Sequence, residues 1–477
     1  MYTETISRKG AIDLLKRPSV RFILLFITSI LFYLPFASLA LAEPIEDIRQ
    51  LIRDEYVDSV PESVLSKKAG KEITDALDPH SVYLSKKEFE GFINAIDQRI
   101  FGIGIVLEEH AKGVKVISVI PKSPAEQAGI LQGDIITNVN GTSIAGKTVQ
   151  SAVTLIGGEE GTVVTLSIER PEVSKAITMK VKRQEIHLPV VESAMLGGHV
   201  GYIRLNSFSN EAAGEMNEAI RSLKGAKGWI VDLRDNGGGY ITAAQDVAGF
   251  FPEVRYAFQL REKNKQPILY EAHRQKNLLE GPAALLINEF SASASEMVSA
   301  TVKEKSAATL YGQRSYGKGT MQSMYPFTDG SVLKLTTARF YSPGGQAVDQ
   351  VGVLPDQETE IGEEVIQAHR DLLISGVQGY SRMRPLLNVP KTKTFTIEMN
   401  TKMNWRTLSS NTVQLIELGG EEVPVAIQGK NSTTVIISPK KPLLAGGKYM
   451  LIVHPNVTSQ AGKPMKKGIY VEVQVKQ

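Results

Sequence analysis

The chain has 477 residues, 42% of them hydrophobic and 22% charged, a composition typical of a soluble globular protein with about three or four domains. It contains no cysteine, which excludes disulfides, thiolate metal sites and a cysteine nucleophile. The net charge of +3 is unevenly distributed: residues 384–477 have a formal charge of +8, and 43–383 are acidic. The basic stretch predicts either an anionic partner or a solvated basic surface.

The first 42 residues have the pattern of an export signal. Five basic residues precede an uncharged apolar run from Phe22 to Ala42, which ends in Ala40-Leu41-Ala42. This is typical of a secretory signal peptide, and the length of the run also fits an uncleaved membrane anchor. We therefore expect an exported protein whose remainder is extracytoplasmic, either released by cleavage or held by a membrane anchor.

Residues 43–97 are predicted to be a helical N-terminal region. Apolar residues recur at helical spacing over Ile45–Val57 and again over Lys86–Ile100. Between these helices the run LDPHSVYL (77–84) predicts a turn.

Residues 98–185 are predicted to form a compact unit of short strands. Strands are expected at 102–105, 114–120, 134–139, 162–168 and 177–181, with a helix at 149–156. Ser123-Pro124-Ala125-Glu126 followed by Gly129 predicts a one-turn helix with both caps encoded.

Within the next unit, 186–381, residues 198–345 alternate between strands and helices, which predicts an α/β layer structure. The expected strands are 200–205, 229–233 and 283–287, and the expected helices run from an Asn210 cap to Leu223 and over 241–251. Residues 385–477 contain only short strands at regular spacing, typical of a β-sandwich, and 382–389 is expected to be a linker.

The run Ser291–Glu296 offers a candidate nucleophile at the start of a helix. Ser293 would lie at the helix N-terminus, where free N–H groups stabilise negative charge, and its neighbours are small. The alternative is purely structural, because Ser293-Ala294-Ser295-Glu296 is also a capping box.

The run Gly317–Gln322 offers a candidate base. A lysine accepts protons only if its amine is neutral, which requires burial and no carboxylate partner. Lys318 has no acidic residue within ten positions in the sequence, and Gln322 can hold its amine without adding charge. His80 is the best-placed alternative base, although no motif places a histidine beside Ser293.

Two further interpretations concern glycines. Residues 312–318 match the first seven positions of a phosphate-binding P-loop, but the eighth position, which should be Ser or Thr, is Gly319. The run Gly237-Gly238-Gly239 after Asp235-Asn236 can supply half of an oxyanion hole, or serve only as a turn.

Together these segments resemble the carboxyl-terminal processing proteases, also called tail-specific proteases. The match covers nearly all of 45–356. The recurring pieces are LDPHSVYLS (77–85), GIGI (102–105), SPAEQAGI…GDII (123–136), GYIRLNSF (201–208), VDLRDNGGG (231–239), SASASE (291–296), YGKGTMQ (316–322), LKLTTARFYSP (333–343) and GVLPD (352–356).

The resemblance implies a multidomain α/β and β architecture. It consists of the helical N-terminal region, a PDZ domain at 98–185 and an α/β, crotonase-like serine protease core at 186–381. Residues 385–477 resemble bacterial Ig-like domains instead, through Ser438–Leu443 and Gly447–Tyr449.

The resemblance also implies roles for individual residues. The family's nucleophile falls on Ser293, its general base on Lys318 and its supporting glutamine on Gln322. Its oxyanion hole falls on the amide of Ala294 and one glycine amide, and the sequence does not choose between Gly238 and Gly239. The family often has proline at the position of Gly237, and glycine there makes the turn looser while keeping its amides.

The peptide-binding loop of the PDZ domain falls on Gly102, Ile103, Gly104 and Ile105. The implied partners are protein or peptide substrates with free C-termini, an anionic cell-wall polymer at the basic tail, and a second copy through 45–97. No cofactor, metal or nucleic acid is expected. The function expected is an exported Ser/Lys endopeptidase acting through an acyl-enzyme, and the alternative is a non-catalytic envelope-binding protein.

Overall fold

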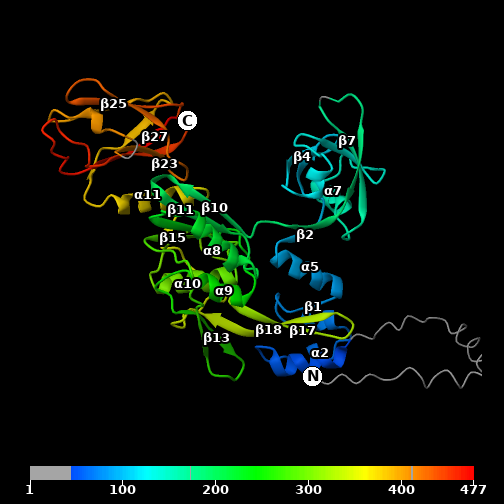
Figure 1. Ribbon diagram of the computed structural model, residues 1–477. Helices are drawn as coiled ribbons and strands as arrows, with labels where there is room; N and C mark the ends of the chain where they lie inside the picture. The colour runs from blue at the N-terminus through cyan, green and yellow to red at the C-terminus, as the bar shows by residue number, and fades with distance from the viewer. Residues whose placement is uncertain (1–43, 172, 410–411) are drawn as a thin grey trace, which may run out of the picture.

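The computed structural model describes residues 44–171, 173–409 and 412–477 (Figure 1). The expected signal or anchor at 1–42 lies outside these residues. Among the described helices, none has the length and apolar character needed to cross a membrane.

The N-terminal region packs against a long hairpin of the core. Its elements are α2 (Ile45–Glu55), α3 (Glu62–Leu65), α4 (Gly70–Thr74), β1 (Val82–Leu84) and α5 (Lys86–Ile96). The buried residues Ile48 and Ile52 of α2 share one apolar cluster with Leu333 and Leu335 of β18 (Val332–Tyr341). The second expected helix ends at Ile96 instead of residue 100, because the chain turns through a positive φ at Gln98 and enters the strand β2 (Arg99–Gly102).

A six-stranded β-structure with two short helices occupies most of 98–185. Its main sheet has the order β3-β4-β5-β7-β8, with β6 paired to β5. Its elements are β3 (Ile105–His110), β4 (Gly113–Val119), α6 (Pro124–Gln127), β5 (Ile135–Val139), β6 (Thr142–Ser143), α7 (Val149–Ile156), β7 (Val163–Glu169) and β8 (Ile177–Lys182). The predicted cap of α6 is confirmed, since Ser123 Oγ accepts from Glu126 N–H at 3.3 Å.

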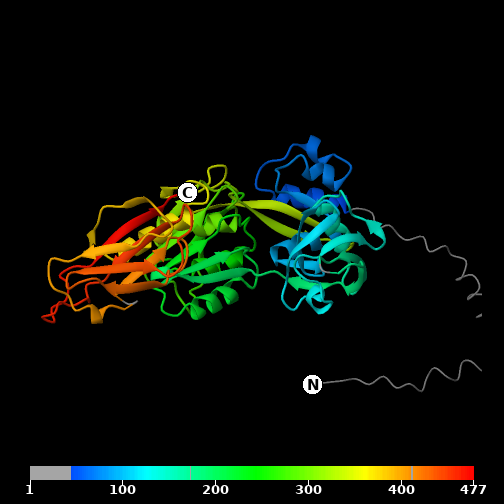
Figure 2. The same ribbon diagram turned by 90° about the horizontal axis from the view of Figure 1, so that it is seen from above.

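Two antiparallel strands connect this unit to the rest of the chain. They are β2 (Arg99–Gly102) and β9 (Gln184–His187), which form a separate two-stranded sheet. Figures 1 and 2 show the unit beyond these strands, at the same end of the molecule as the N-terminal helices.

The core contains a six-stranded sheet of order β10-β11-β12-β15-β16-β19, parallel from β11 onwards. Its elements are β10 (Val191–Leu196), η2 (Gly197–His199), β11 (Val200–Leu205), α8 (Ala212–Ser222), β12 (Gly228–Asp232), α9 (Ile241–Ala248), β15 (Ala283–Ile287), α10 (Ala294–Glu304), β16 (Thr309–Gly312), β19 (Gln357–Glu358) and α11 (Glu364–Gly376). The expected Asn210 cap is wrong: α8 begins after Glu211, without a side-chain cap bond.

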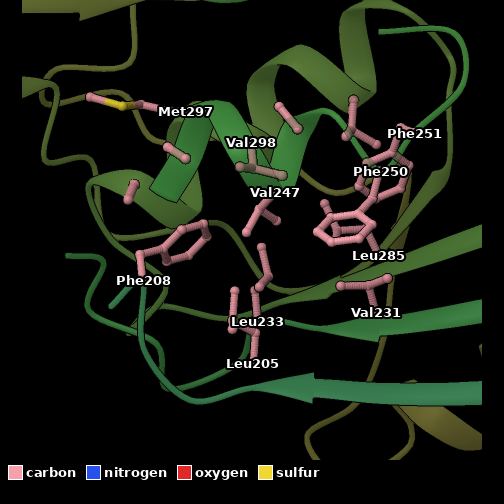
Figure 3. Packing of buried hydrophobic residues seen from close by; sticks show 14 of the residues in the cluster. Leu205, Phe208, Val231, Leu233, Val247, Phe250, Phe251, Leu285, Met297 and Val298 are labelled. Carbon is pink, nitrogen blue, oxygen red and sulfur yellow. The ribbon is translucent and has the colours of Figure 1, made fainter. Parts of the chain in front are cut away.

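Both faces of this sheet are buried, as a parallel sheet requires. On one face Val231, Leu233 and Leu285 pack under α8, α9 and α10 (Figure 3). On the other face Ile230 and Leu286 pack against α11, a helix that the sequence patterns did not predict. Burial of each such side chain contributes about 1.5–3 kcal/mol to folding.

A second core sheet crosses to the N-terminal region. Its order is β1-β18-β13-β14, with β17 paired to β18. The remaining elements are β13 (Tyr256–Glu262), β14 (Ile268–Glu271) and β17 (Thr320–Pro326). The hairpin of β17 and β18 extends from the core to the N-terminal helices (Figure 1).

The tail is the predicted β-sandwich, of five and three strands in its two sheets. Its elements are β20 (Ser381–Arg382), β21 (Leu386–Val389), β22 (Phe395–Glu398), η3 (Trp405–Thr407), β23 (Val413–Glu417), β24 (Val425–Gly429), β25 (Thr434–Pro439), β26 (Lys448–Val453) and β27 (Ile469–Val475). The expected linker at 382–389 is wrong, because β20 and β21 both pair with β27 and belong to the sandwich.

The sandwich shares a core with the parallel sheet. Ile416, Met450 and Ile452 of the tail lie in the same apolar cluster as Ile230 and Leu286. The buried His369 of α11 joins the two parts: its Nε2–H donates to Gly197 O at 2.8 Å and its Nδ1 accepts from Gly419 N–H at 2.9 Å.

Candidate active site

Ser293 lies where β15 leads into α10, as the sequence predicted. It occupies the N-cap position with φ 58° and ψ −112°, a backbone conformation that non-glycine residues rarely adopt. Its neighbours Ala292 and Ala294 are buried, whereas Ser293 itself is only partly covered. The turn thus presents the side chain of one residue and hides those on either side.

Glu296 connects the two runs that the sequence singled out. Its carboxylate is fully buried and accepts from Ser293 N–H at 2.9 Å, Lys318 N–H at 2.8 Å, Gly317 N–H at 2.6 Å and the Ser315 hydroxyl at 2.6 Å. Burial raises the pKa of Glu296, while these hydrogen bonds oppose the shift. The carboxylate half of the expected capping box is therefore formed, and Glu296 N–H donates in turn to the Ser293 carbonyl at 2.8 Å.

The glycines around Lys318 belong to a strand entry and not to a P-loop. After Gly319 the chain continues as β17, so no helix N-terminus follows to bind a phosphate. A Cβ at Gly319 would lie 2.1 Å from the backbone nitrogen of Asp349, which leaves no room for the serine or threonine of a P-loop. The nucleotide-binding interpretation is therefore wrong.

The amine of Lys318 is placed where it loses its proton easily. Burial lowers the pKa of Lys318 to about 8, and the positive charge of Lys334 acts in the same direction. Glu296 and Asp78 oppose the shift. The Glu296 carboxylate receives the four hydrogen bonds described above from other groups, so it does not pair with this amine.

Gln322 is oriented by two threonines. Its Nε2 donates to Thr320 Oγ1 at 3.0 Å and to Thr336 Oγ1 at 3.3 Å. A β-bulge between Met321 and Gln322 alters the direction of this strand, a device common beside active sites. Because both amide hydrogens have acceptors, the carbonyl oxygen of Gln322 is left to accept a bond from another donor.

The glycine turn approaches the start of α10 closely. A Cβ at Gly238 would lie 2.9 Å from both Ala294 N and Ser293 Cβ, so only glycine fits there. The Gly238 N–H already donates to Asn236 Oδ1 at 2.9 Å. Within the described residues, the N–H groups of Gly239 and Ala294 have no protein acceptor. The local geometry thus favours Gly239 over Gly238 as the partner of Ala294.

One cavity of about 630 Å³ brings these residues together. Its lining includes Ser293, Lys318, Gln322, Gly238 and Gly239, all from segments predicted to carry the chemistry. The apolar part of its wall comes from α5, α9, α10 and β17: Phe92, Ile93, Ile96, Ile241, Met297, Met321 and Met324. A hydroxyl, an amine and free amides therefore meet beside an apolar surface.

His80 does not line this cavity. Burial lowers the pKa of His80, and the nearby positive charge of Lys318 lowers it further. In the described ranges, no group of three or more His, Asp or Glu side chains is arranged to hold a metal ion.

The expected peptide-binding loop lies between β2 and β3. The Ile103 side chain is buried in the core of this unit, so only its backbone is available to a ligand. The carbonyls of Ile103 and Gly104 accept from Ala125 N–H and Ile120 N–H at 2.8 and 3.0 Å. These bonds fix the loop against the start of α6.

Three charged residues around Lys318 were not predicted from the sequence to belong to the site. The sequence predicts Glu296 only as a helix cap, and it predicts no role for Asp78 or Lys334. Asp78 accepts from Thr336 Oγ1 at 3.0 Å, and Lys334 lines the cavity. Asp78 and Lys334 lie in the runs LDPHS and LKLTT, which resemble family motifs, but no local pattern in the sequence places these runs beside Lys318.

Three family models match the chain. Peptidase family S41 matches residues 199–359, a PDZ domain matches 115–170, and a bacterial Ig-like domain matches 386–471. The PDZ match begins after the expected peptide-binding loop at 102–105.

Relatives match about two thirds of this chain. The carboxy-terminal processing protease CtpA of Bacillus subtilis is 35% identical over 65% of this chain and 67% of its own length. The "Probable CtpA-like serine protease" of Staphylococcus aureus (strain COL) is 34% identical over 65% of this chain and 63% of its own. A solved photosystem II D1 C-terminal processing protease is 24% identical, covering 70% of this chain and 96% of its own, with a TM-score of 0.44.

Proposed function

The chain belongs to peptidase family S41, among the carboxy-terminal processing serine proteases, and on that premise we propose that it is a Ser/Lys endopeptidase. The observation that carries the proposal is the shared cavity of Ser293 and Lys318, in which burial lowers the pKa of the lysine to about 8. A fraction of this amine is then neutral near neutral pH and can act as a base without histidine.

The proposed reaction begins with proton transfer from Ser293 Oγ to the neutral Lys318 amine. Oγ attacks the scissile carbonyl carbon, and the tetrahedral intermediate collapses as the Lys318 ammonium returns its proton to the leaving amine. This releases the C-terminal fragment and leaves an ester on Ser293. Water then attacks the ester carbonyl as Lys318 accepts a proton from it, and Lys318 passes that proton to Ser293 Oγ as the acid product leaves.

The N–H groups of Gly239 and Ala294 are proposed to hold the negative oxygen of the intermediate. Support comes from the free state of both amides and from the approach of the glycine turn to the start of α10. Removing one such donor typically reduces kcat by about 10²–10³-fold. Gln322 is proposed to accept a hydrogen bond from Lys318 through its carbonyl oxygen and so orient the amine.

The PDZ domain is proposed to bind the free C-terminus of a protein substrate. A backbone loop at Gly102–Ile105 would receive the terminal carboxylate, beside α7. A pair of peptides that differ only in a free or amidated C-terminus tests this step. We expect amidation to raise KM and to leave kcat much less affected; equal KM values would contradict recognition of the carboxylate.

We also propose that the protein is exported and held at the membrane or the cell wall, and that its tail binds the wall. We propose further that two copies pair through 45–97. The +8 charge of the tail supports an anionic cell-wall polymer as its partner. Charge reversal at the exposed Lys440, Lys441, Lys466 and Lys467 should release the protein from purified walls, and unchanged binding would refute a charge-driven contact. Sedimentation of residues 44–477 tests pairing.

The decisive experiment is proteolysis of an unfolded protein with an apolar C-terminus. We expect cleavage by the wild type and none by Ser293→Ala or Lys318→Ala. Ser222→Ala and Lys224→Met, which change solvent-exposed residues at the end of α8, serve as matched controls. Equal cleavage by all variants would refute the mechanism, and inactivity of the wild type would favour the non-catalytic alternative.

A further inference from the structure

A second lysine stands beside the candidate base and has no part in the mechanism above. Lys334 lies on β18, opposite Met324 of β17 and Val82 of β1. Its neighbours Leu333 and Leu335 face the apolar cluster under the N-terminal helices. Strand alternation therefore turns Lys334 to the opposite face, where it lines the cavity with Ser293 and Lys318.

Burial lowers the pKa of Lys334, but two neighbours, Phe92 and Asp78, stabilise its positive charge. Its ammonium nitrogen lies 5.0 Å from the ring centroid of Phe92 of α5, a cation–π arrangement. Asp78 supplies a nearby negative charge, which opposes the lowering of the Lys334 pKa by burial. The Asp78 carboxylate stays ionised readily, since His80 N–H, the Ser81 hydroxyl and Thr336 Oγ1 donate to it at 2.8, 2.6 and 3.0 Å.

Lys318 has a different set of neighbours. No aromatic ring faces its ammonium nitrogen in the described chain, and no carboxylate pairs with it. The charged and titratable groups around it are Lys334 of β18, Glu296 of α10, and Asp78 and His80 of the turn before β1. Two amines in one half-buried cavity disfavour each other's charge, and the one with less support loses its proton first.

We propose that Lys334 is a positioning residue of this site: a permanent cation, held over Phe92, that disfavours a second positive charge on Lys318 and so keeps the base able to accept a proton. The inference rests on the proposed Ser/Lys function. It also assigns a role to the two sequence runs that the mechanism did not use. LKLTT supplies the second cation, and LDPHS supplies the carboxylate that orients the neighbouring threonine.

The direction of the effect follows from the charges. Removing the charge at position 334 removes a repulsion, so the pKa of Lys318 rises and less of its amine is neutral near pH 7. A rise of about one pKa unit would reduce the neutral fraction roughly tenfold at that pH. Above the new pKa the base is neutral again, and the activity should return.

The test is the pH profile of kcat/KM for peptide cleavage, measured for the wild type, Lys334→Met, Lys334→Arg and the surface control Lys224→Met. We expect the acidic limb of Lys334→Met to move upward by about one pH unit, with an approximately tenfold loss near pH 7 that is recovered at alkaline pH. Lys334→Arg, which keeps the charge, and Lys224→Met should retain the wild-type limb.

An unchanged acidic limb in Lys334→Met would overturn the inference, as would an equal loss at every pH, which indicates a structural role only. If Lys334→Met does not fold, Lys334→Gln carries the same expectation. An inactive wild type would overturn the proposed function and this inference with it. If the wild type is active and the acidic limb of its pH profile is the same as that of Lys334→Met, the inference about Lys334 is wrong and the proposed function stands.

Discussion

The carboxylate of Glu296 makes a sharp prediction, because it holds the candidate nucleophile and the candidate base in one geometry. The substitution Glu296→Gln preserves the size of the side chain but turns one acceptor oxygen into an amino group. One oxygen receives Ser315 and Gly317, and the other receives Ser293 and Lys318. In either orientation of the amide, its NH2 group faces the two groups that had donated to that carboxylate oxygen, so both of those hydrogen bonds are lost.

The expected loss of stability follows from these two bonds. A hydrogen bond to a charged group contributes about 1.5–3 kcal/mol, so losing two destabilises the core by roughly 3 kcal/mol or more. For a domain of about 200 residues each kcal/mol lowers Tm by about 2–4 °C, which predicts a fall of roughly 6–12 °C.

The effect on activity has two opposing parts. Without the negative charge of Glu296 the pKa of Lys318 falls further, so the acidic limb of the pH profile should move to lower pH. The backbone that positions Ser293 loses its anchor, so kcat should fall on the order of 10²-fold at every pH. Thermal unfolding and the pH dependence of kcat/KM measure both parts. Wild-type Tm and kcat in Glu296→Gln would refute the argument that this carboxylate joins the two segments.

Three other predictions follow from the charges and the packing. With the pKa of Lys318 at about 8, wild-type kcat/KM should fall about tenfold per pH unit below that value, and a flat profile down to about pH 6 would exclude this base. Burial lowers the pKa of His369, so its neutral form stabilises the fold above the unfolded pKa of about 6.5, and this stability is lost as pH falls through the folded pKa. His369→Gln should be less stable at neutral pH and should lose less on acidification, as denaturation curves at both pH values would reveal. Truncation after Tyr380 should yield aggregated protein, seen by gel filtration, because it uncovers the apolar residues of the sheet, and a monomeric, active fragment would contradict the shared core.

Local patterns in the sequence predicted much of the fold. The bounds of α7, β11 and β15 agree with the predicted ranges to the residue, since each is a run of one periodicity ended by a turn or cap. The helix α11 was missed, although it carries one side of the contact with the tail. The linker was misassigned because β20 and β21 are strands only by pairing with β27, which is distant in the sequence.

For the candidate site, too, local patterns predicted some features, and contacts between distant segments determined the others. Ser293, Lys318 and Gln322 were predicted because each lies in a run that resembles a family motif. The charges around these residues were not predicted, because the groups that carry them come from distant parts of the sequence. Asp78, for example, accepts from Thr336, which lies 258 positions away. A pattern can indicate which side chain reacts, but the charges that tune its pKa are fixed by tertiary contacts.

The packing of the tail bears on the same site. The strand β12 leads into the glycine turn, and β15 leads into the turn that carries Ser293. Residues Ile230 of β12 and Leu286 of β15 lie on the face of the sheet opposite α8, α9 and α10, and the cluster that covers them includes Ile416 and Ile452 of the Ig-like domain. The tail therefore supports the two strands that position the proposed oxyanion amides and the proposed nucleophile. For this reason loss of wall binding in a tail deletion would not by itself identify a binding surface, whereas charge reversal on exposed lysines leaves the shared core intact.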